Sequence, residues 1–589
     1  MPFFAFNCDA PQNQASYIGS IVAVSNRKVT INVPGRLLDR ILVGNLVAVP
    51  LMGQERWIIG IIDRVNTHLQ GEGNNTAGIT LVGTVSTSDH NGTFFTRALS
   101  RLPRAKIPVF GLSGADLSKF MELLVRTGKT DEALLLGHYT LDLSAAAYLD
   151  GDKFFQRHAA LLGSTGSGKS WAVTTIIEQA AKLPSANLIV FDLHGEYSSL
   201  SYARKLRIPG PDDLNNPQPN MLFLPYWLMT AEEFSAALVD PREATAHDQT
   251  LVLHREIENA KGTFLKQQGY DNLTDLFTVD SPIPFSLDNL VRRLDELNTK
   301  VYQEYRGSKQ GEYFGMFSRL LVRLQTKRND KRYGFLFNLP DFYYDYEAFA
   351  ALAQQLLDFT NPAARVRIID FSEVPVEIMP IMLGIVARLV YYLQFWMSSK
   401  TRHPIALICD EAHRYLPREC NSPNEERTLA NFQKIAKEGR KYGVSLIVVS
   451  QRPAELDTTV LSQCNNVLAL RLTNTNDQAV VCKLVPDDLM SILDTLPVLE
   501  TGEVLALGDA VLLPSRITIQ PPHEKPVSAT VDFWSEWKRE GQVPDWHLAA
   551  DSMRYQRRSG NGNNGTPALT PSRAKPEEVA SFLKFRDAK

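Results

Sequence analysis

Eight residues near position 165 have the composition and spacing of a phosphate-binding loop. They match the pattern G-x-x-x-x-G-K-S and run Gly163-Ser164-Thr165-Gly166-Ser167-Gly168-Lys169-Ser170. Glycine is needed where backbone N–H groups approach phosphate oxygens, because a side chain would collide there or the backbone needs a positive φ. Lys169 is expected to reach the β- and γ-phosphates of ATP, and Ser170 to place its hydroxyl on Mg²⁺. An apolar run precedes the loop and a helical pattern follows it, as the motif requires.

Two carboxylates follow an apolar run later in the chain and would complete such a site. Asp410 and Glu411 come directly after the run 405–409. At the end of a buried strand, Asp410 is expected beside Mg²⁺, and Glu411 is expected where it can orient and polarise the attacking water. A solvated acidic pair would explain the two residues alone, but not their combination with the loop. The sequence therefore predicts a site that hydrolyses ATP with Mg²⁺.

The run Asp410-Glu411-Ala412-His413 also spells the box of helicases that close ATP between two RecA-like domains of one chain. Only one phosphate loop and one predicted sheet are visible here, and too little chain follows residue 510 for a second such domain. The other half of the site must then come from a neighbouring subunit. We therefore predict a ring.

Three further side chains are candidates for the hydrolysis step. Gln451 ends the next predicted strand and is expected near the γ-phosphate, although a turn-capping role would also explain it. Arg440 lies at the end of a predicted helix, where the helix dipole alone favours a cation. Its functional interpretation is an arginine finger that acts on the ATP of the neighbouring subunit. Arg157, just before the strand that leads into the loop, is a second arginine candidate, with a structural role as its alternative.

The composition is that of a globular protein without a strong overall charge. The 589 residues include 62 basic and 65 acidic side chains, so any DNA binding must be local. The five cysteines show no C-x-x-C spacing, which disfavours a disulfide framework and a zinc site. No secretory signal is read at the start, and Arg388 interrupts the most apolar stretch, 378–387, before it reaches the ~20 residues of a spanning helix. We expect a buried core helix, no membrane contact and a cytoplasmic protein.

The hydrophobic pattern changes near residue 150. Before that point, short β-branched runs at 17–24, 28–33, 46–49 and 57–62 predict a small N-terminal β-barrel. After it, apolar runs alternate with helical segments, which is typical of an α/β fold with a doubly wound parallel sheet, here a RecA-like P-loop core. The predicted strands of this sheet are 159–162, 188–191, 366–369, 405–408, 445–449 and 467–470.

The spacing of these strands predicts an insertion. Residues 192–365 are too many for a simple crossover, and helical periodicity at 231–238 and 287–297 predicts an inserted helical domain. Near the C-terminus, 559–565 is predicted to be a flexible linker and 576–586 a short helix or docking tail. The resulting division is a β-barrel domain at 1–125, the core at 126–224 and 351–525, the helical insertion at 225–350 and a C-terminal extension at 526–589.

Several of these motifs together resemble the HerA-type ATPases of the HerA–FtsK group. The resemblance rests on the phosphate loop, on Asp192-Leu193-His194-Gly195-Glu196-Tyr197, and on the motifs around Asp410, Arg440 and Gln451. It covers most of the chain from 15 to 525, with an N-terminal segment similar to the family's HAS-barrel-like domain and an insertion similar to its helical domain. The Asp-x-His-Gly-Glu-Tyr run is the most family-specific element, and it leaves the roles of its His and Glu unassigned.

The resemblance implies a homohexameric translocase that threads double-stranded DNA through its central channel, driven by ATP hydrolysis. Family members work beside an effector encoded nearby, a nuclease or a sirtuin-like NADase, in DNA end processing or anti-phage defence. Two rivals remain open: a secretion or conjugation ATPase, and a ring that scaffolds an effector with ATP as a switch. A basic cluster is a candidate DNA contact, although a solvated helical face would also explain it: Arg319, Arg323, Lys327, Arg328, Lys331 and Arg332.

Overall fold

The computed structural model of the chain describes residues 3–554, except 5, 52–55, 68–74, 89–91, 100, 126–132, 141, 305–306, 359, 362–363, 485–489, 512, 528–532 and 540–544. Residues Met1–Val531 pack as one compact unit, and Asp532–Lys589 form a second. The second unit contains helices α15 (Phe533–Trp537) and α16 (Trp546–Arg554). The predicted linker at 559–565 and the predicted tail helix at 576–586 lie outside the described residues. The domain boundaries within the first unit stay predictions, because that unit packs as a whole.

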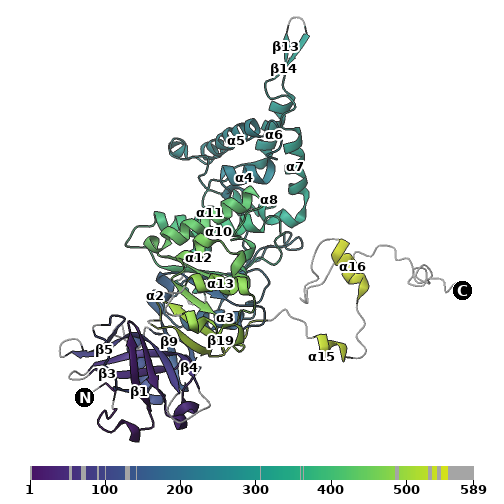
Figure 1. Cartoon of the computed structure of the whole chain (residues 1–589). Helices are drawn as coiled ribbons and strands as arrows, with labels where there is room; N and C mark the ends of the chain where they lie inside the picture. The colour runs from purple at the N-terminus through teal and green to yellow at the C-terminus, as the bar shows by residue number, and fades with distance from the viewer. Residues whose placement is uncertain are drawn as a thin grey trace, which may run out of the picture. The chain divides into compact units, whose positions relative to one another are not determined.

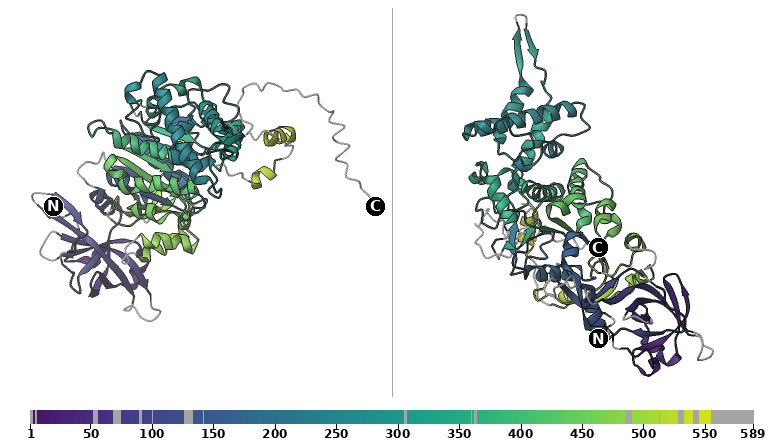
Figure 2. Two further views of the ribbon diagram at one scale, coloured as in Figure 1. Left: turned by 90° about the horizontal axis from the view of Figure 1, so that it is seen from above. Right: turned by 90° about the vertical axis from the view of Figure 1, so that its left-hand side faces the viewer.

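The N-terminal strands form a closed barrel, drawn in purple in Figures 1 and 2. They are β1 (Tyr17–Ser25), β2 (Lys28–Asn32), β3 (Leu46–Leu51), β4 (Arg56–Asn66), β5 (Thr76–Ser88), β6 (Gly92–Thr96) and β7 (Pro108–Gly111), and α1 (Gly114–Val125) follows them. The order β2-β1-β7-β3-β4-β5 closes through pairing of β2 with β5, and β6 adds to β5. Closure satisfies backbone groups that open edges would expose. The barrel was predicted from its first four strands, and β5 to β7 complete it.

The core is one large sheet. Its strands are β8 (Ala133–Tyr139), β9 (Asp142–Asp150), β10 (Ala159–Leu162), β11 (Leu188–Asp192), β12 (Arg204–Arg207), β15 (Val366–Asp370), β16 (Ile405–Cys409), β17 (Val444–Ser450), β18 (Asn466–Ala469), β19 (Glu503–Gly508) and β20 (Ser515–Ile519). The order is β12-β15-β11-β16-β17-β10-β18-β19-β20-β8-β9, with 11 strands. The pairs from β12 to β18 are parallel, and those from β18 to β9 are antiparallel. All six predicted strands lie in the parallel part.

Helices cover both faces of this sheet, because successive side chains of a strand point to opposite faces. The core helices are α2 (Gly151–Gln156), α3 (Lys169–Ala181), α10 (Met379–Trp396), α11 (Pro423–Glu438), α12 (Thr458–Gln463), α13 (Thr475–Lys483) and α14 (Met490–Leu493). In β11, Ile189 and Phe191 pack into the hydrophobic cluster that includes α10 and α11. Leu188 and Val190 pack into the cluster that includes α3. A doubly covered sheet explains why its strands read as continuous apolar runs.

Helix α10 contains the apolar stretch that the sequence singles out. It is longer than the predicted run, and among the described residues it is the one helix whose length and composition would allow it to cross a membrane. Such a test is weak evidence, since core helices also pass it. In this protein 61% of its 18-residue window is buried inside the structure, as predicted for a core helix.

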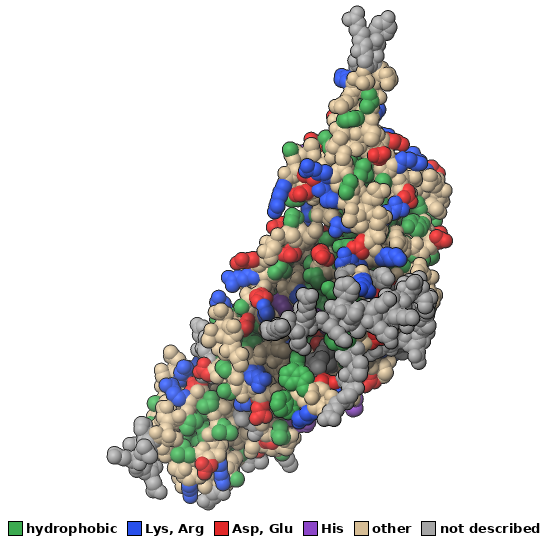
Figure 3. Space-filling view, turned by 90° about the vertical axis from the view of Figure 1, so that its right-hand side faces the viewer, with side chains coloured by type: hydrophobic (Ala, Val, Ile, Leu, Met, Phe, Trp, Pro, Cys, Tyr) green, Lys and Arg blue, Asp and Glu red, His purple; other side chains and the backbone are tan. Residues whose placement is uncertain are grey.

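The insertion lies between β12 and β15 and is mainly helical. Its elements are α4 (Ala231–Leu238), α5 (Ala246–Gln267), α6 (Leu287–Thr299), the hairpin β13 (Val301–Glu304) and β14 (Gly307–Gln310), α7 (Ser318–Asn329), α8 (Gly334–Phe337) and α9 (Ala348–Leu357). The two predicted helices correspond to α4 and α6. Figure 1 shows the hairpin projecting from the helices at the top of the view. Over the face drawn in Figure 3, basic and acidic side chains are interspersed, as the nearly equal totals suggest.

A buried ion pair joins the insertion to the core. Arg388 of α10 donates to the Glu233 carboxylate of α4 at 2.9 Å and to the Leu228 carbonyl at 2.7 Å. Glu233 also accepts from the backbone N–H of Thr230 in a capping box at the start of α4. Both side chains of the pair are nearly buried, so either partner alone would be an uncompensated charge.

Arg388→Ala should therefore lower the free energy of unfolding by about 3–5 kcal/mol, since it leaves Glu233 buried without its cation. The urea midpoint of the unfolding transition measures this loss. Arg427→Ala is the matched control, because Arg427 also reaches α4 but pairs with the exposed Glu232 at 3.4 Å. It should cost less than about 1 kcal/mol. Equal losses for the two variants would contradict the assigned role of the buried pair.

Candidate nucleotide-binding site

Four neighbouring parallel strands bring the candidate site residues to one edge of the sheet. The strands lie in the order β11-β16-β17-β10, so their carboxyl ends share an edge. The phosphate loop follows β10, Gln451 follows β17, Asp410 and Glu411 follow β16, and Glu196 comes soon after β11. Ligands of open α/β sheets bind at such carboxyl edges.

The phosphate loop is held open by its neighbours. The N–H of Gly163 donates to the Ser450 carbonyl at 3.2 Å, and the N–H of Ser164 donates to the Arg471 carbonyl at 2.9 Å. Gly168 adopts φ +100°, a region that favours glycine, directly before α3 begins. A Cβ on Gly163 would lie 2.6 Å from the Oγ of Ser167. The loop thus ends at a helix N-terminus, where free N–H groups and the helix dipole favour phosphate.

Lys169 lies within the loop and close to the carboxylates. Its Nζ donates to the Ser164 carbonyl at 3.1 Å. Burial lowers the pKa of Lys169, while Glu411, Asp410 and Glu196 act in the opposite direction and favour its charged form. The ammonium is therefore positioned between the loop and the acidic groups, where it can contact the phosphates of a bound nucleotide.

The buried carboxylate of Asp410 is the electrostatic centre of the site. Burial, together with the nearby Glu411 and Glu196 carboxylates, raises its pKa to about 7. Tyr197 Oη donates to its Oδ2 at 3.1 Å. A cation beside these oxygens would favour the ionised form, and oxygen donors are the ligands that Mg²⁺ prefers. The donor set therefore fits Mg²⁺, which Ser170, Asp410 and Glu196 would hold or surround, supplying charge neutralisation for the phosphates.

Gln451 connects the loop to Glu411. Its Oε1 accepts from Thr165 Oγ1 at 2.5 Å, and its Nε2 donates to Glu411 Oε2 at 2.9 Å. His413 Nδ1 lies 3.3 Å from the same Glu411 oxygen. Glu411 itself has φ +47°, an unusual conformation for a residue with a side chain, of the kind that clusters at functional sites. This arrangement can transmit the state of the loop to the carboxylate that is expected to orient water.

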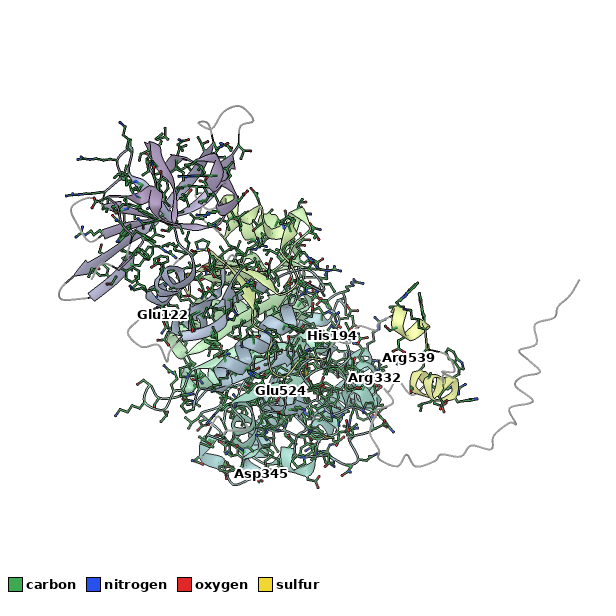
Figure 4. The ribbon with its side chains drawn as sticks, turned by 90° about the horizontal axis from the view of Figure 1, so that it is seen from below. Glu122, His194, Arg332, Asp345, Glu524 and Arg539 are labelled. Atoms are coloured by element: carbon green, nitrogen blue, oxygen red, sulfur yellow. The ribbon has the colours of Figure 1, made fainter. Side chains whose placement is uncertain are left out.

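Asp192 holds a turn that positions Glu196 and Tyr197. The sequence left the role of Glu196 open and predicted no role for Tyr197. The fully buried Asp192 carboxylate accepts from the N–H groups of His194, Gly195, Glu196 and Tyr197 at 2.8–3.3 Å. The turn brings the Glu196 carboxylate to the Ser170 hydroxyl, which donates to it at 2.7 Å. His194, labelled in Figure 4, is exposed. The Asp-x-His-Gly-Glu-Tyr run was the signal in the sequence, but it did not show where Glu196 and Tyr197 would point.

The two candidate arginines lie at the opposite edge of the sheet. Arg157 precedes β10 and Arg440 precedes β17, so both are at the amino ends of neighbouring parallel strands. The four residues of β10 and the seven of β17 separate them from their own carboxyl edge by about 13 and 23 Å. Arg157 pairs with Asp509, whereas the exposed Arg440 has no carboxylate partner among the described residues. Neither arginine can reach the nucleotide site of its own chain.

The basic cluster of the insertion is largely engaged within the insertion itself. Arg323 pairs with Glu243 at 2.7 Å, Arg328 with Asp288 at 2.5 Å, and Arg332 with Asp330 at 2.7 Å. The Lys327 ammonium lies over the Tyr333 ring at 4.9 Å. Four of the six side chains, including Arg332, which is labelled in Figure 4, therefore have local structural partners. The cluster supplies no specific support for a DNA contact.

A phosphate loop that opens a helix, with two carboxylates at the end of a neighbouring strand, defines a P-loop ATPase, an enzyme that hydrolyses ATP. Residues 134–390 match the family model described as Helicase HerA, central domain. The DNA double-strand break repair helicase HerA of Sulfolobus acidocaldarius is 25% identical over 415 residues, which cover 66% of this chain and 71% of the relative. Its counterpart in Saccharolobus solfataricus is 26% identical over 394 residues, 65% of this chain and 68% of the relative. Over about two thirds of its length, the chain is therefore similar to the HerA-type ATPases.

Among solved structures, the match to VirB4 of Thermoanaerobacter pseudethanolicus covers 67% of this chain and 97% of the VirB4 chain, with 16% identity and a TM-score of 0.42. The plasmid coupling protein TrwB in complex with ADP and Mg²⁺ covers 71% of this chain and 94% of its own, with 14% identity and a TM-score of 0.42. Both likenesses are distant.

Glu196→Gln should raise the Mg²⁺ concentration needed for half-maximal binding of a fluorescent ADP by about 10-fold, a typical cost of losing a group that supports a metal site. Binding of the same nucleotide in EDTA should not change, because the variant keeps the loop. Glu178→Gln is the control, since Glu178 is on α3 but contacts His523 outside the site. An unchanged Mg²⁺ requirement in Glu196→Gln would remove Glu196 from the metal site.

Proposed function

We propose that this chain is the subunit of an ATP-driven translocase or helicase that moves along double-stranded DNA. The proposal rests on the contacts that link the phosphate loop to Gln451 and Gln451 to Glu411, next to Asp410. It also rests on the similarity of about two thirds of the chain to DNA double-strand break repair helicases. Hydrolysis at this site would supply the energy for movement. Contacts to DNA would be mainly to phosphates and largely independent of sequence.

The working form in this proposal is a homohexameric ring in which neighbouring subunits share each site. The position of Arg440 supports sharing, because an exposed arginine at the amino edge can serve only the carboxyl edge of another copy. There it would neutralise the charge that develops on the γ-phosphate. Arg157 is the second candidate for this role, although its pairing with Asp509 favours a structural function.

The proposal includes a biological setting. We place the ring in the cytoplasm beside an effector, a nuclease or a sirtuin-like NADase, in DNA end processing or anti-phage defence. Two alternative functions are a secretion or conjugation ATPase, which would also be a motor, and a ring that scaffolds an effector and uses ATP only as a switch. Measured coupling between DNA and ATP hydrolysis separates these possibilities.

Double-stranded DNA should increase the ATPase rate several-fold, and Glu411→Gln should bind ATP while remaining inactive with or without DNA.

The affinity for DNA should fall by about 10³-fold between 50 and 200 mM salt if six or more phosphates are contacted. Filter binding across a salt series measures the slope, and a scrambled duplex of equal length tests sequence preference. An ATPase rate that ignores DNA would favour the switch, and strong preference for one sequence would favour a specific binder.

Mixing two inactive variants tests the shared site. Lys169→Ala lacks a working loop but still presents Arg440, whereas Arg440→Ala binds ATP but cannot assist its neighbour. Rings that contain both variants should recover part of the parent ATPase rate, because some interfaces then pair an intact loop with an intact arginine. Native mass spectrometry of the mixture establishes that subunits have exchanged. Verified mixed rings with no recovery would argue against a catalytic Arg440 in trans.

A further inference from the structure

Aromatic and basic side chains gather at the end of α10. Phe395 is the central member, with its ring centroid 5.1 Å from Trp396, 5.0 Å from Tyr442 and 6.3 Å from Tyr392. Lys434 Nζ lies 4.8 Å from the Tyr392 centroid, and the Arg402 guanidinium lies 5.3 Å from the Tyr442 centroid. We call this set the amino-edge patch: Tyr392, Phe395, Trp396, Arg402, Lys434 and Tyr442.

The aromatic side chains of the amino-edge patch are exposed to solvent. Trp396 is 78% exposed, and Tyr392 and Phe395 are each more than a third exposed. The edge-to-face and tilted ring contacts and the two cation–π contacts restrict the rotamers of these side chains before any partner binds. Preordered Trp, Tyr and Arg side chains are typical of the residues that dominate protein interfaces, because little entropy is lost when they become buried.

The patch borders the arginine that the proposed function assigns to a neighbouring site. Helix α10 ends at Trp396 just before β16, and Tyr442 ends η10 (Gly439–Tyr442), which contains Arg440, just before β17. The patch and Arg440 therefore occupy the amino ends of two adjacent strands. The carboxyl ends of the same two strands carry Glu411 and Gln451.

We propose that the amino-edge patch is the docking surface for the carboxyl edge of a second copy of this chain. The proposal rests on the proposed ring and names the contact that holds its subunits. In a head-to-tail ring, each subunit places one surface against a different surface of the next, and the rotation closes. The two edges of one sheet are such a pair of surfaces, and an arginine can reach the neighbouring phosphate only if the side chains around it are buried in the contact.

The carboxyl edge of a second copy complements the amino-edge patch in charge and in exposed apolar surface. The amino edge carries the cations Arg402, Lys434 and Arg440, whereas the carboxyl edge carries the half-buried Glu196 and Glu411 carboxylates and would also carry the anionic phosphates of a bound nucleotide. The carboxyl edge also has exposed apolar side chains, Val376 after β15 and Trp171 at the start of α3. Complementary charge favours this orientation over contact between like edges, and aromatic burial supplies the apolar part of the interface.

Trp396→Ala in the full-length protein tests the proposal, because an exposed side chain can be truncated without loss of the fold. Sedimentation velocity with a non-hydrolysable ATP analogue should show assembly at a protein concentration at least ~10-fold higher than for the parent, as expected for a central interface residue. Binding of fluorescent ADP to the dissociated subunit should be unchanged. Phe342→Ala, which removes an exposed aromatic side chain of the insertion, is the matched control and should assemble like the parent.

A photo-crosslinking amino acid at position 396 identifies the occupant directly. Mass spectrometry of the adducts should find peptides from the carboxyl edge of another copy, such as 165–171, 371–378 or 411–414. Adducts to DNA, to another protein or to the amino edge of another copy would overturn the proposal, as would parent-like assembly of Trp396→Ala. If Trp396→Ala assembled like the parent and DNA stimulated the ATPase activity of its rings, the proposed function would stand and only the docking surface would be wrong. A protein that forms no ring at any concentration would overturn both.

Discussion

The parallel alignment of β11, β16, β17 and β10 is the constraint on which the rest of the structure depends. Parallel strands must all end at the same edge, so four segments separated by up to several hundred residues present their following loops side by side. The phosphate loop, Gln451, Glu411 and Glu196 each follow a different one of these strands. Parallel strands need crossover connections, which helices α3, α10 and α11 provide here. These helices also bury both faces of the sheet.

The site that results is electrostatically incomplete. Three carboxylates lie close together around a buried position, which raises the pKa of Asp410, while burial lowers the pKa of Lys169. The Ser170 hydroxyl donates to Glu196, and the Lys169 ammonium donates to the Ser164 carbonyl. A magnesium nucleotide brings both the cation that the carboxylates favour and the anion that the loop and Lys169 favour. Binding and local charge are therefore coupled at a single edge.

The same alignment that gathers the site separates it from the arginines. A strand that delivers a loop to the carboxyl edge necessarily delivers the residues before it to the amino edge. Arg157 and Arg440 are thus excluded from their own nucleotide site by the length of β10 and β17. The proposed role of Arg440 in trans and the proposed docking surface at the amino edge both follow from this one geometry, and both require that copies of the chain meet edge to edge.

The sequence by itself determined the local chemistry and the fold class. The phosphate-loop motif and the strand–helix periodicity depend on neighbours within a few residues, so Gly163 to Ser170, Asp410, Glu411 and six of the seven parallel strands could be predicted, all but β12. Strand β8, which pairs with the distant β20, and the closing strands β5 to β7 carry weaker local patterns and were not predicted. Only the tertiary structure decided that Ser170 donates to Glu196, that Tyr197 donates to Asp410, and that Arg440 lies at the opposite edge of the sheet from its own candidate site. Those outcomes depend on which strands become neighbours in the sheet, and burial across the whole chain determines that order.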